Sequence, residues 1–173
     1  MRAAVALIPL LLAGCAPAPV ATVAEVLASC DAYKGKIARV AGYLADCGGY
    51  GCGLFRDRSH WRAYRAAWAD EKRIPRDADG RPDRKALDAV WERINALWPM
   101  GVGFNPMVEP RLTVHNDRYV IISGRMNEHS CIGEGTDRAE GIAPNDVRVW
   151  TKAAGAPADA NDNTPFRPST TLH

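Results

Sequence analysis

The sequence predicts a mainly β protein with inserted helices, an α+β chain built as a small β-barrel with a two-helix insertion. Two observations carry this prediction. Residues 36–46 align without gaps on residues 118–128, and a glycine takes the same place in both copies, at Gly42 and Gly124. Two long strands bent by a glycine are what a small closed sheet needs. Between them, at about residues 58–99, the composition shifts to Ala, Arg and Trp at helical spacing.

The first residues have the form of an export signal. Arg2 is the only charged residue before an apolar run, residues 3–13, that is too short to span a bilayer. The run ends in Leu-Ala-Gly-Cys, and this ending resembles the lipobox of bacterial lipoproteins. The resemblance implies cleavage before Cys15, a diacylglyceryl group on its sulfur and an acylated amino group.

We therefore expect a signal peptide over residues 1–14 and a lipidated tether over residues 15–21 that anchors the chain to a membrane. Ala16 after the cysteine resembles outer-membrane sorting in a Gram-negative cell, which implies the periplasmic face of the outer membrane. An ordinary secretory cleavage near the same place would instead leave a soluble protein.

A short helix and a pair of strands should follow the tether. Thr22 and Glu25 fit a capping box, which predicts a helix over residues 23–29. The next predicted elements are a strand at 36–45, a glycine-rich turn at 47–52 and a return strand at 53–56.

The predicted insertion consists of two helices. Residues 59–72 carry Trp61, Tyr64 and Trp68 at helical spacing, and residues 84–98 carry an apolar stripe after a cap at Asp83. The three aromatic residues of the first helix are our candidate interaction surface, provided that packing does not bury them.

The remaining elements complete the barrel. After a loop at 100–110 we expect strands at 111–116, 118–127 and 146–152. Residues 153–173 contain few large apolar side chains and are predicted to be disordered. The folded domain should therefore span residues 22–152.

Two short patterns connect this chain to a known kind of protein. Tyr33-Lys34-Gly35-Lys36 precedes a strand that ends in Gly42-Tyr43-Leu44, and a later strand begins with Tyr119-Val120 and reaches Gly124. The chain thereby resembles small bacterial exported proteins with an OB-like barrel. The resemblance covers roughly residues 22–56 and 111–152 and implies the fold. It assigns no catalytic residue, because OB barrels host many activities.

Four cysteines remain once Cys15 carries the lipid. An even number of cysteines in an exported domain predicts two disulfides. Cys47 and Cys52 close a very short loop and are the first expected pair, which leaves Cys30 for Cys131. The other two connectivities stay open at this point, because spacing alone does not decide between them.

Charge and composition argue against nucleic acid as a partner. The chain has 22 basic and 20 acidic side chains, a formal net charge of +2, so it lacks the excess of positive charge that phosphate binding requires. We expect a membrane contact through the N-terminal lipid, with an envelope protein or a small ligand as the further partner. No second long apolar run follows residue 13, so we expect no transmembrane helix.

One alternative would give the chain metal or redox chemistry. Soft ligands gather at residues 126–131, and His129 and Cys131 together with Cys47 and Cys52 could hold copper or zinc. A thiol-exchange protein would instead carry Cys-x-x-Cys at the start of a helix, a spacing that Cys47 and Cys52 do not have. The even cysteine count favours structural disulfides, so we expect neither a metal nor another cofactor.

The sequence also lacks the patterns of common enzymes. We find no Ser-His-Asp order, paired-carboxylate pattern, phosphate-binding loop or His-Glu-x-x-His. Our expectation is a non-catalytic binding or interaction module of the cell envelope, with the metal or redox protein as the alternative.

Overall fold

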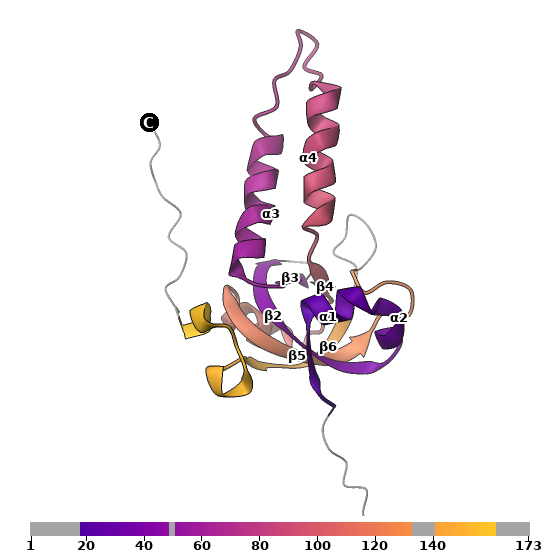
Figure 1. The fold of residues 1–173 in the computed structure, drawn as a ribbon, viewed down its shortest axis with the longest axis vertical. Helices are drawn as coiled ribbons and strands as arrows, with labels where there is room; N and C mark the ends of the chain where they lie inside the picture. Colours follow the sequence, from indigo (N-terminus) through magenta and orange to yellow (C-terminus); the bar gives the residue numbers. More distant parts are fainter. Residues whose placement is uncertain (1–17, 49–50, 133–140, 162–173) are drawn as a thin grey trace, which may run out of the picture.

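The computed structural model describes residues 18–48, 51–132 and 141–161. The predicted signal peptide and the lipidation residue Cys15 lie outside the described residues, as does the chain after Asn161. Figure 1 shows a small barrel with two long helices that project from one end.

The barrel is a closed five-stranded mixed sheet with one extra strand at its edge, which confirms the predicted fold class and the OB-like barrel. Strand order is β1-β2-β3-β4-β6-β5, and β2 pairs again with β5 to close the circle. The strands are β1 (Val20–Thr22), β2 (Ile37–Gly48), β3 (Gly51–Phe55), β4 (Met100–Val102), β5 (Arg118–Met126) and β6 (Ile142–Val149).

The repeated sequence corresponds to β2 and β5, which are antiparallel neighbours. Val40 pairs with Ile122, the residue that matches it in the repeat, and the two glycines lie symmetrically on either side of this pair. A Cβ on Gly42 would lie 2.6 Å from the carbonyl oxygen of Phe55, and one on Gly124 would lie 2.2 Å from that of Ala143. Both glycines are therefore required by the close approach of a neighbouring strand.

The inside of the barrel is apolar and is closed at one end by helix α1 (Val23–Ala28). Val40, Leu44 and Ile122 are fully buried there, and Val23 and Val26 of α1 pack against them. The predicted capping box is present, because the backbone N–H of Glu25 donates to Thr22 Oγ1 at 3.2 Å and the N–H of Thr22 donates to the Glu25 carboxylate at 2.7 Å. A short helix, α2 (Cys30–Tyr33), follows α1.

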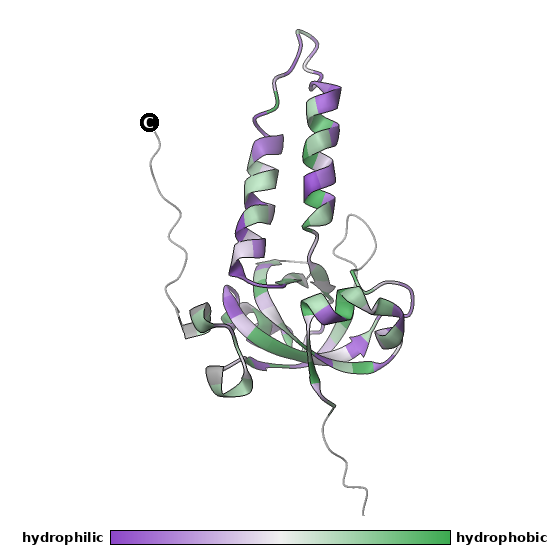
Figure 2. Cartoon of the chain, in the orientation of Figure 1, coloured by the Kyte–Doolittle hydropathy of each residue, from purple (hydrophilic) through white to green (hydrophobic). Residues whose placement is uncertain are grey.

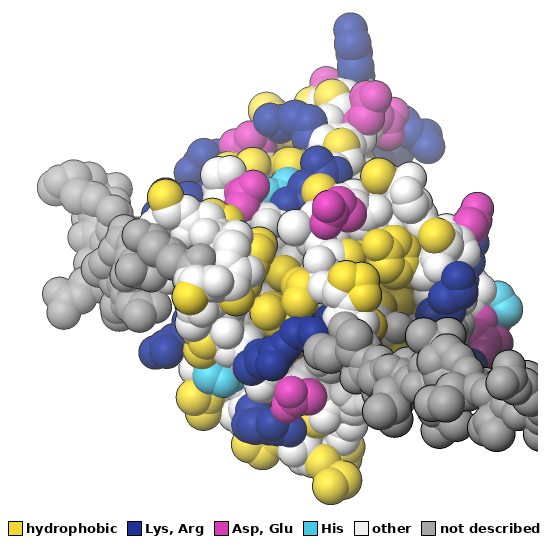
Figure 3. Space-filling model, turned by 60° about the horizontal axis from the view of Figure 1, so that its bottom comes forward, with side chains coloured by type: hydrophobic (Ala, Val, Ile, Leu, Met, Phe, Trp, Pro, Cys, Tyr) yellow, Lys and Arg dark blue, Asp and Glu magenta, His cyan; other side chains and the backbone are white. Residues whose placement is uncertain are grey.

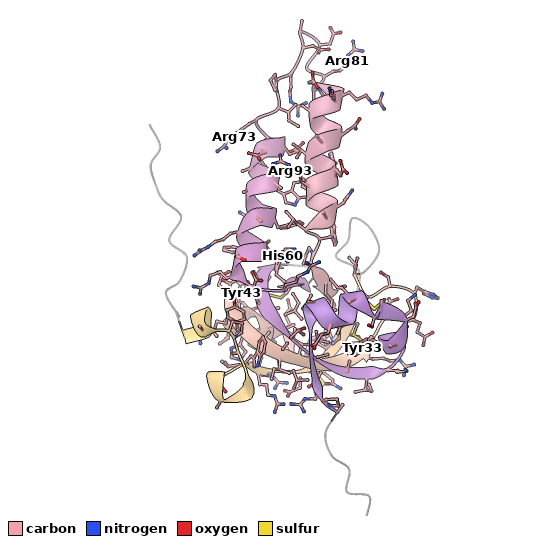
Figure 4. All side chains as sticks on the ribbon, in the orientation of Figure 1. Tyr33, Tyr43, His60, Arg73, Arg81 and Arg93 are labelled. Atoms are coloured by element: carbon pink, nitrogen blue, oxygen red, sulfur yellow. A yellow bond between two sulfur atoms is a disulfide. The ribbon has the colours of Figure 1, made fainter. Side chains whose placement is uncertain are left out.

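The two inserted helices form a hairpin between β3 and β4. Helix α3 (Arg58–Glu71) is capped by Asp57, and helix α4 (Arg84–Ala96) is capped by Asp83. Ala67, Val90 and Ile94 form a small core between them, and Arg93 of α4 lies 3.2 Å from the carboxylate of Asp70 on α3 (Figure 4). Figure 2 shows hydrophobic residues along the barrel strands and alternating with hydrophilic ones on the hairpin.

The prediction of a strand at 111–116 is wrong, because these residues belong to helix α5 (Glu109–Val114). Pro110 lies in the first turn of α5, where its missing N–H is tolerated. Leu112 packs into the barrel core at 2 % exposure, whereas Val114 is 69 % exposed. This short segment therefore has one buried and one exposed apolar position on a helix, rather than the two faces of a strand.

Other boundaries also differ from the predictions. Strand β4 lies in the segment predicted to be a loop, and β1 begins at Val20, inside the predicted tether. The last strand begins at Ile142 rather than at residue 146 and ends at Val149. Each of these strands is defined by its pairing partners, which are far away in the sequence.

The prediction of disorder is wrong for the start of the tail. Two 3-10 helices, η2 (Lys152–Ala154) and η3 (Ala158–Asn161), follow Trp150, whose indole N–H donates to the carbonyl of Ala154 at 2.8 Å. Ala156 and Ala160 pack against the outside of the barrel. The folded unit therefore extends beyond residue 152. Within the described ranges, no helix is both long and apolar enough to cross a bilayer.

Candidate binding site

A cavity of about 640 Å³ lies between the helical hairpin and the end of the barrel. Its floor comes from the β3–β4 side of the barrel, at Cys52, Gly53 and Gly101. Its walls come from α3, α4 and the segment after α4. We call it the aromatic cavity, because five rings line it: Phe55, Tyr64, Trp68, Trp91 and Trp98.

The five rings form one connected series. Tyr64 lies at its centre, with ring centroids 5.4 Å from Phe55, 6.2 Å from Trp68 and 6.1 Å from Trp98. The ring centroid of Trp91 lies 5.3 Å from that of Trp68, so Trp91 extends the series. Three of these contacts are edge-to-face and that of Phe55 with Tyr64 is tilted, geometries in which aromatic pairs attract one another, so the rings pack together as one apolar wall.

The three residues of the predicted interaction surface lie in two different places. Tyr64 and Trp68 line the aromatic cavity, as a surface for binding would require. Trp61 is 6 % exposed, and its ring centroid lies 5.8 Å from that of Tyr43. It therefore belongs to a second buried cluster on the outside of the barrel, which we call the outer core and which also contains Tyr119 and Trp150. Trp91 and Trp98 were expected to lie in the apolar stripe of α4, and the structure adds them to the site.

A second cavity, of about 670 Å³, lies on the other side of α3. We call it the polar cavity, because its lining includes Asp46, Arg62, Arg65, Asn116 and Asp117. Asp46 and Arg65 line both cavities, and their side chains form an ion pair at 3.5 Å.

Asp46 and Asp117 share an unusual backbone conformation. Their φ angles are +53° and +62°, and they are the non-glycine residues with positive φ within the described residues. Aspartate tolerates this left-handed region better than most residues, because its short polar side chain can bond locally. Asp46 lies where the β2–β3 register shifts, and Asp117 directly precedes β5.

Burial and neighbouring charge perturb this cluster. Burial raises the pKa of Asp117 above its ordinary value, and the carboxylate of Asp46 raises it further, while Arg58 and Arg65 act in the opposite direction. The pKa of Tyr43 is also raised, chiefly by burial, although its bond with Arg58 opposes this. This cluster cannot be recognised in the sequence, because its two aspartates are 71 residues apart and are brought together by the pairing of Leu44 with Arg118.

Asp57, Ser59 and His60 lie together at the start of α3, where they act as a helix cap. Asp57 Oδ1 accepts bonds from Ser59 Oγ at 2.5 Å and from the His60 backbone N–H at 2.8 Å. Burial alone would raise the pKa of Asp57, but these bonds outweigh it and the pKa is lowered. His60 Nδ1 accepts from the backbone N–H of Arg56 at 3.4 Å, so this nitrogen faces the backbone rather than the Ser59 hydroxyl.

The four described cysteines lie in two pairs, consistent with the two expected disulfides. The Sγ atoms of Cys30 and Cys131 are 2.16 Å apart, and those of Cys47 and Cys52 are 2.09 Å apart. His129 lines a shallow pocket with Arg125 and Glu128. No group of three His, Cys, Asp or Glu side chains is arranged to hold a metal ion in the part of the chain that the structure describes.

Comparisons with protein-family models, with curated proteins and with solved structures found no match to this chain. The two cavities and the N-terminal sequence are therefore the features of this chain that bear on its function.

Proposed function

We propose that this chain is an exported lipoprotein, anchored through Cys15 at the periplasmic face of the outer membrane, that binds a small ligand without catalysing a reaction. The aromatic cavity is the observation that carries the binding role. We assign to it a ligand with an apolar ring system and an anionic end.

The size and lining of the cavity support a small molecule. Ligand pockets typically occupy about 300–1,000 Å³ and have largely apolar walls with a few polar groups. The aromatic cavity, at about 640 Å³, is within this range. Aromatic walls favour a ligand with a flat apolar group, because such a group packs well against the faces and edges of the rings.

The charged residues at the cavity support an anionic end. Arg65 and Lys72 are two cationic side chains in its lining, and Asp46 is the one carboxylate there. The ion pair with Arg65 already balances Asp46. A ligand anion would therefore meet an excess of positive charge near Lys72.

Two dyes test this proposal on the mature chain carrying Cys15→Ser. Anilinonaphthalene sulfonate has an aromatic ring system and an anionic group, and N-phenylnaphthylamine is a neutral analogue. We expect both to bind with increased fluorescence. Trp68→Ala and Trp91→Ala should weaken both dyes by about tenfold, which is about 1.4 kcal/mol. Lys72→Gln should weaken only the anionic dye.

Met107→Ala is the matched control, because Met107 is 87 % exposed and lies outside the cavity. Thermal melts would show that each variant is folded. Equal affinities in Trp91→Ala, Trp68→Ala and Met107→Ala would contradict the proposed site.

The anchor is tested separately in cells. Fatty-acid labelling of the protein should disappear in Cys15→Ser, because no other residue of the proposed lipobox carries a thiol. Labelling that persists in this variant would rule out Cys15 as the lipidated residue.

A further inference from the structure

The outer face of the β1–β2–β5 sheet exposes two aliphatic side chains. Val20 is 37 % exposed and Ile37 is 61 % exposed. Val20 pairs with Arg39 in the parallel β1–β2 ladder, and Ile37 pairs with Arg125 in the antiparallel β2–β5 ladder. Paired residues share a face of a sheet, and so do residues two apart in a strand, so all four side chains lie on the same outer face.

This face is also basic. Arg148 of β6 pairs with Ile121 and extends the face beyond β5, and both Arg125 and Arg148 are exposed. Two carboxylates lie nearby, and each has an arginine partner: Glu128 is 3.1 Å from Arg125, and Asp146 is 2.7 Å from Arg111. Figure 3 brings this underside of the molecule forward and shows basic and apolar side chains next to each other.

The chain leaves this face towards its N-terminus. The Arg39 guanidinium donates to the carbonyl of Ala18 at 2.9 Å, so the first described residues lie beside the basic face. Three peptide steps separate Ala18 from Cys15, and an extended chain spans at most about 3.6 Å per residue, so the two Cα atoms lie within about 11 Å. In Figure 1 the indigo strand β1 begins on the side of the barrel opposite to the helical hairpin.

We propose that this face, formed by Val20, Ile37, Arg39, Arg125 and Arg148, lies against the phospholipid headgroups of the anchoring membrane. Arg39 and Arg148 contact anionic lipid, since Arg125 is paired with Glu128, and Ile37 enters the interface beside them. The hairpin and the aromatic cavity then point away from the bilayer, towards ligand in the aqueous phase. This orientation rests on the proposed lipidation of Cys15.

Photo-crosslinking tests the orientation in the full lipidated chain. The protein is placed in vesicles of phosphatidylethanolamine and phosphatidylglycerol, with benzoylphenylalanine at position 37 or, as the control, at position 85 on the exposed side of α4. We expect at least tenfold more lipid adduct from position 37. Equal adducts in a protein whose intact mass shows the acyl groups would overturn the orientation, whereas a mass without acyl groups would instead contradict the proposed anchor.

A second measurement tests the face without the lipid. The mature chain carrying Cys15→Ser should co-sediment with phosphatidylglycerol vesicles at low salt and not with phosphatidylcholine vesicles. Arg125→Glu with Arg148→Glu should abolish this binding. The double variant Arg84→Glu with Lys85→Glu makes the same change of charge on the hairpin, and it should still bind the phosphatidylglycerol vesicles. Equal loss in both double variants, or no binding by the parent chain, would overturn the proposed face.

Discussion

Gly124 is a described glycine at which the barrel has no room for a side chain. A Cβ there would lie 2.2 Å from the carbonyl oxygen of Ala143, a backbone atom that cannot move without breaking the β5–β6 ladder. We predict that Gly124→Ala lowers the free energy of unfolding by about 3 kcal/mol or more, at the upper end of overpacking effects. Urea denaturation measures this loss.

Gly80 provides the matched control, because it has a positive φ of 76° and no atom within 4 Å of an added Cβ. Gly80→Ala carries only the backbone penalty of a left-handed residue, about 1–2 kcal/mol. If Gly80→Ala were the more destabilising substitution, the close approach at Gly124 would not explain the repeated glycine.

Asp117 should make stability depend on pH. Its pKa is raised by burial and then by Asp46, so the folded state binds the proton more tightly than the unfolded chain does. The free energy of unfolding therefore falls as the pH rises through the folded-state pKa. Asp117→Asn removes this effect and keeps a residue that tolerates positive φ.

We predict a higher melting temperature for Asp117→Asn than for the parent chain at pH 7, and a difference that shrinks as the pH is lowered towards 3. Asp88→Asn makes the same charge change on the exposed side of α4 and should show no such trend. A destabilised Asp117→Asn at pH 7 would show that the carboxylate stabilises the fold instead.

The helical hairpin contributes no side chain to the inner core of the barrel. The inner core contains no residue from 56–98, and Leu54 of β3 pairs directly with Met100 of β4. We predict that replacing residues 56–98 with Asn-Gly leaves a folded barrel, since the four residues then between Leu54 and Met100 are enough for a hairpin loop. Because the shortened chain lacks the buried Trp61, its free energy of unfolding should be lower than that of the parent chain by about 3–5 kcal/mol.

Circular dichroism with cooperative thermal unfolding would confirm that the shortened chain is folded. A disordered spectrum would mean that the hairpin is part of the folding unit. This test also separates binding from folding, because the shortened chain lacks Tyr64, Trp68 and Trp91 and should lose the affinity for both dyes.

Elements with a strong local pattern could be predicted from the sequence. The capping box at Thr22, the alternation in β2 and the helical stripe of α4 all appear where expected. Elements made by distant pairing could not: β4 has three residues, and its strand character comes from β3 and β6. The residues of the site divide in the same way between local and distant patterns. Helical spacing in the sequence was enough to select Tyr64 and Trp68. The approach of Asp46 to Asp117 could not be predicted, because it depends on the β2–β5 register.

For the whole molecule, the two cysteine pairs should differ in their effect on stability. Cys30 and Cys131 are separated by 101 residues, and Cys47 and Cys52 by 5. In the chain-entropy model a cross-link stabilises more as its loop grows. We predict losses of about 4–5 kcal/mol for Cys30→Ser with Cys131→Ser and about 2 kcal/mol for Cys47→Ser with Cys52→Ser.

Urea denaturation of the two double variants checks this order. Thiol titration of the denatured, unreduced parent carrying Cys15→Ser should find no free thiol. Four free thiols would contradict the disulfides and would favour the metal-binding alternative.

Binding of a ligand in the aromatic cavity can be tested directly, because the chain has five tryptophans in different surroundings. Trp68, Trp91 and Trp98 line the cavity, whereas Trp150 lies in the outer core of the barrel and donates to Ala154. In nitrogen-15 NMR spectra of the indole groups, N-phenylnaphthylamine should shift the signals of the three cavity tryptophans and leave that of Trp150 in place. Unchanged cavity signals at saturating dye, or a shift confined to Trp150, would contradict the proposed site.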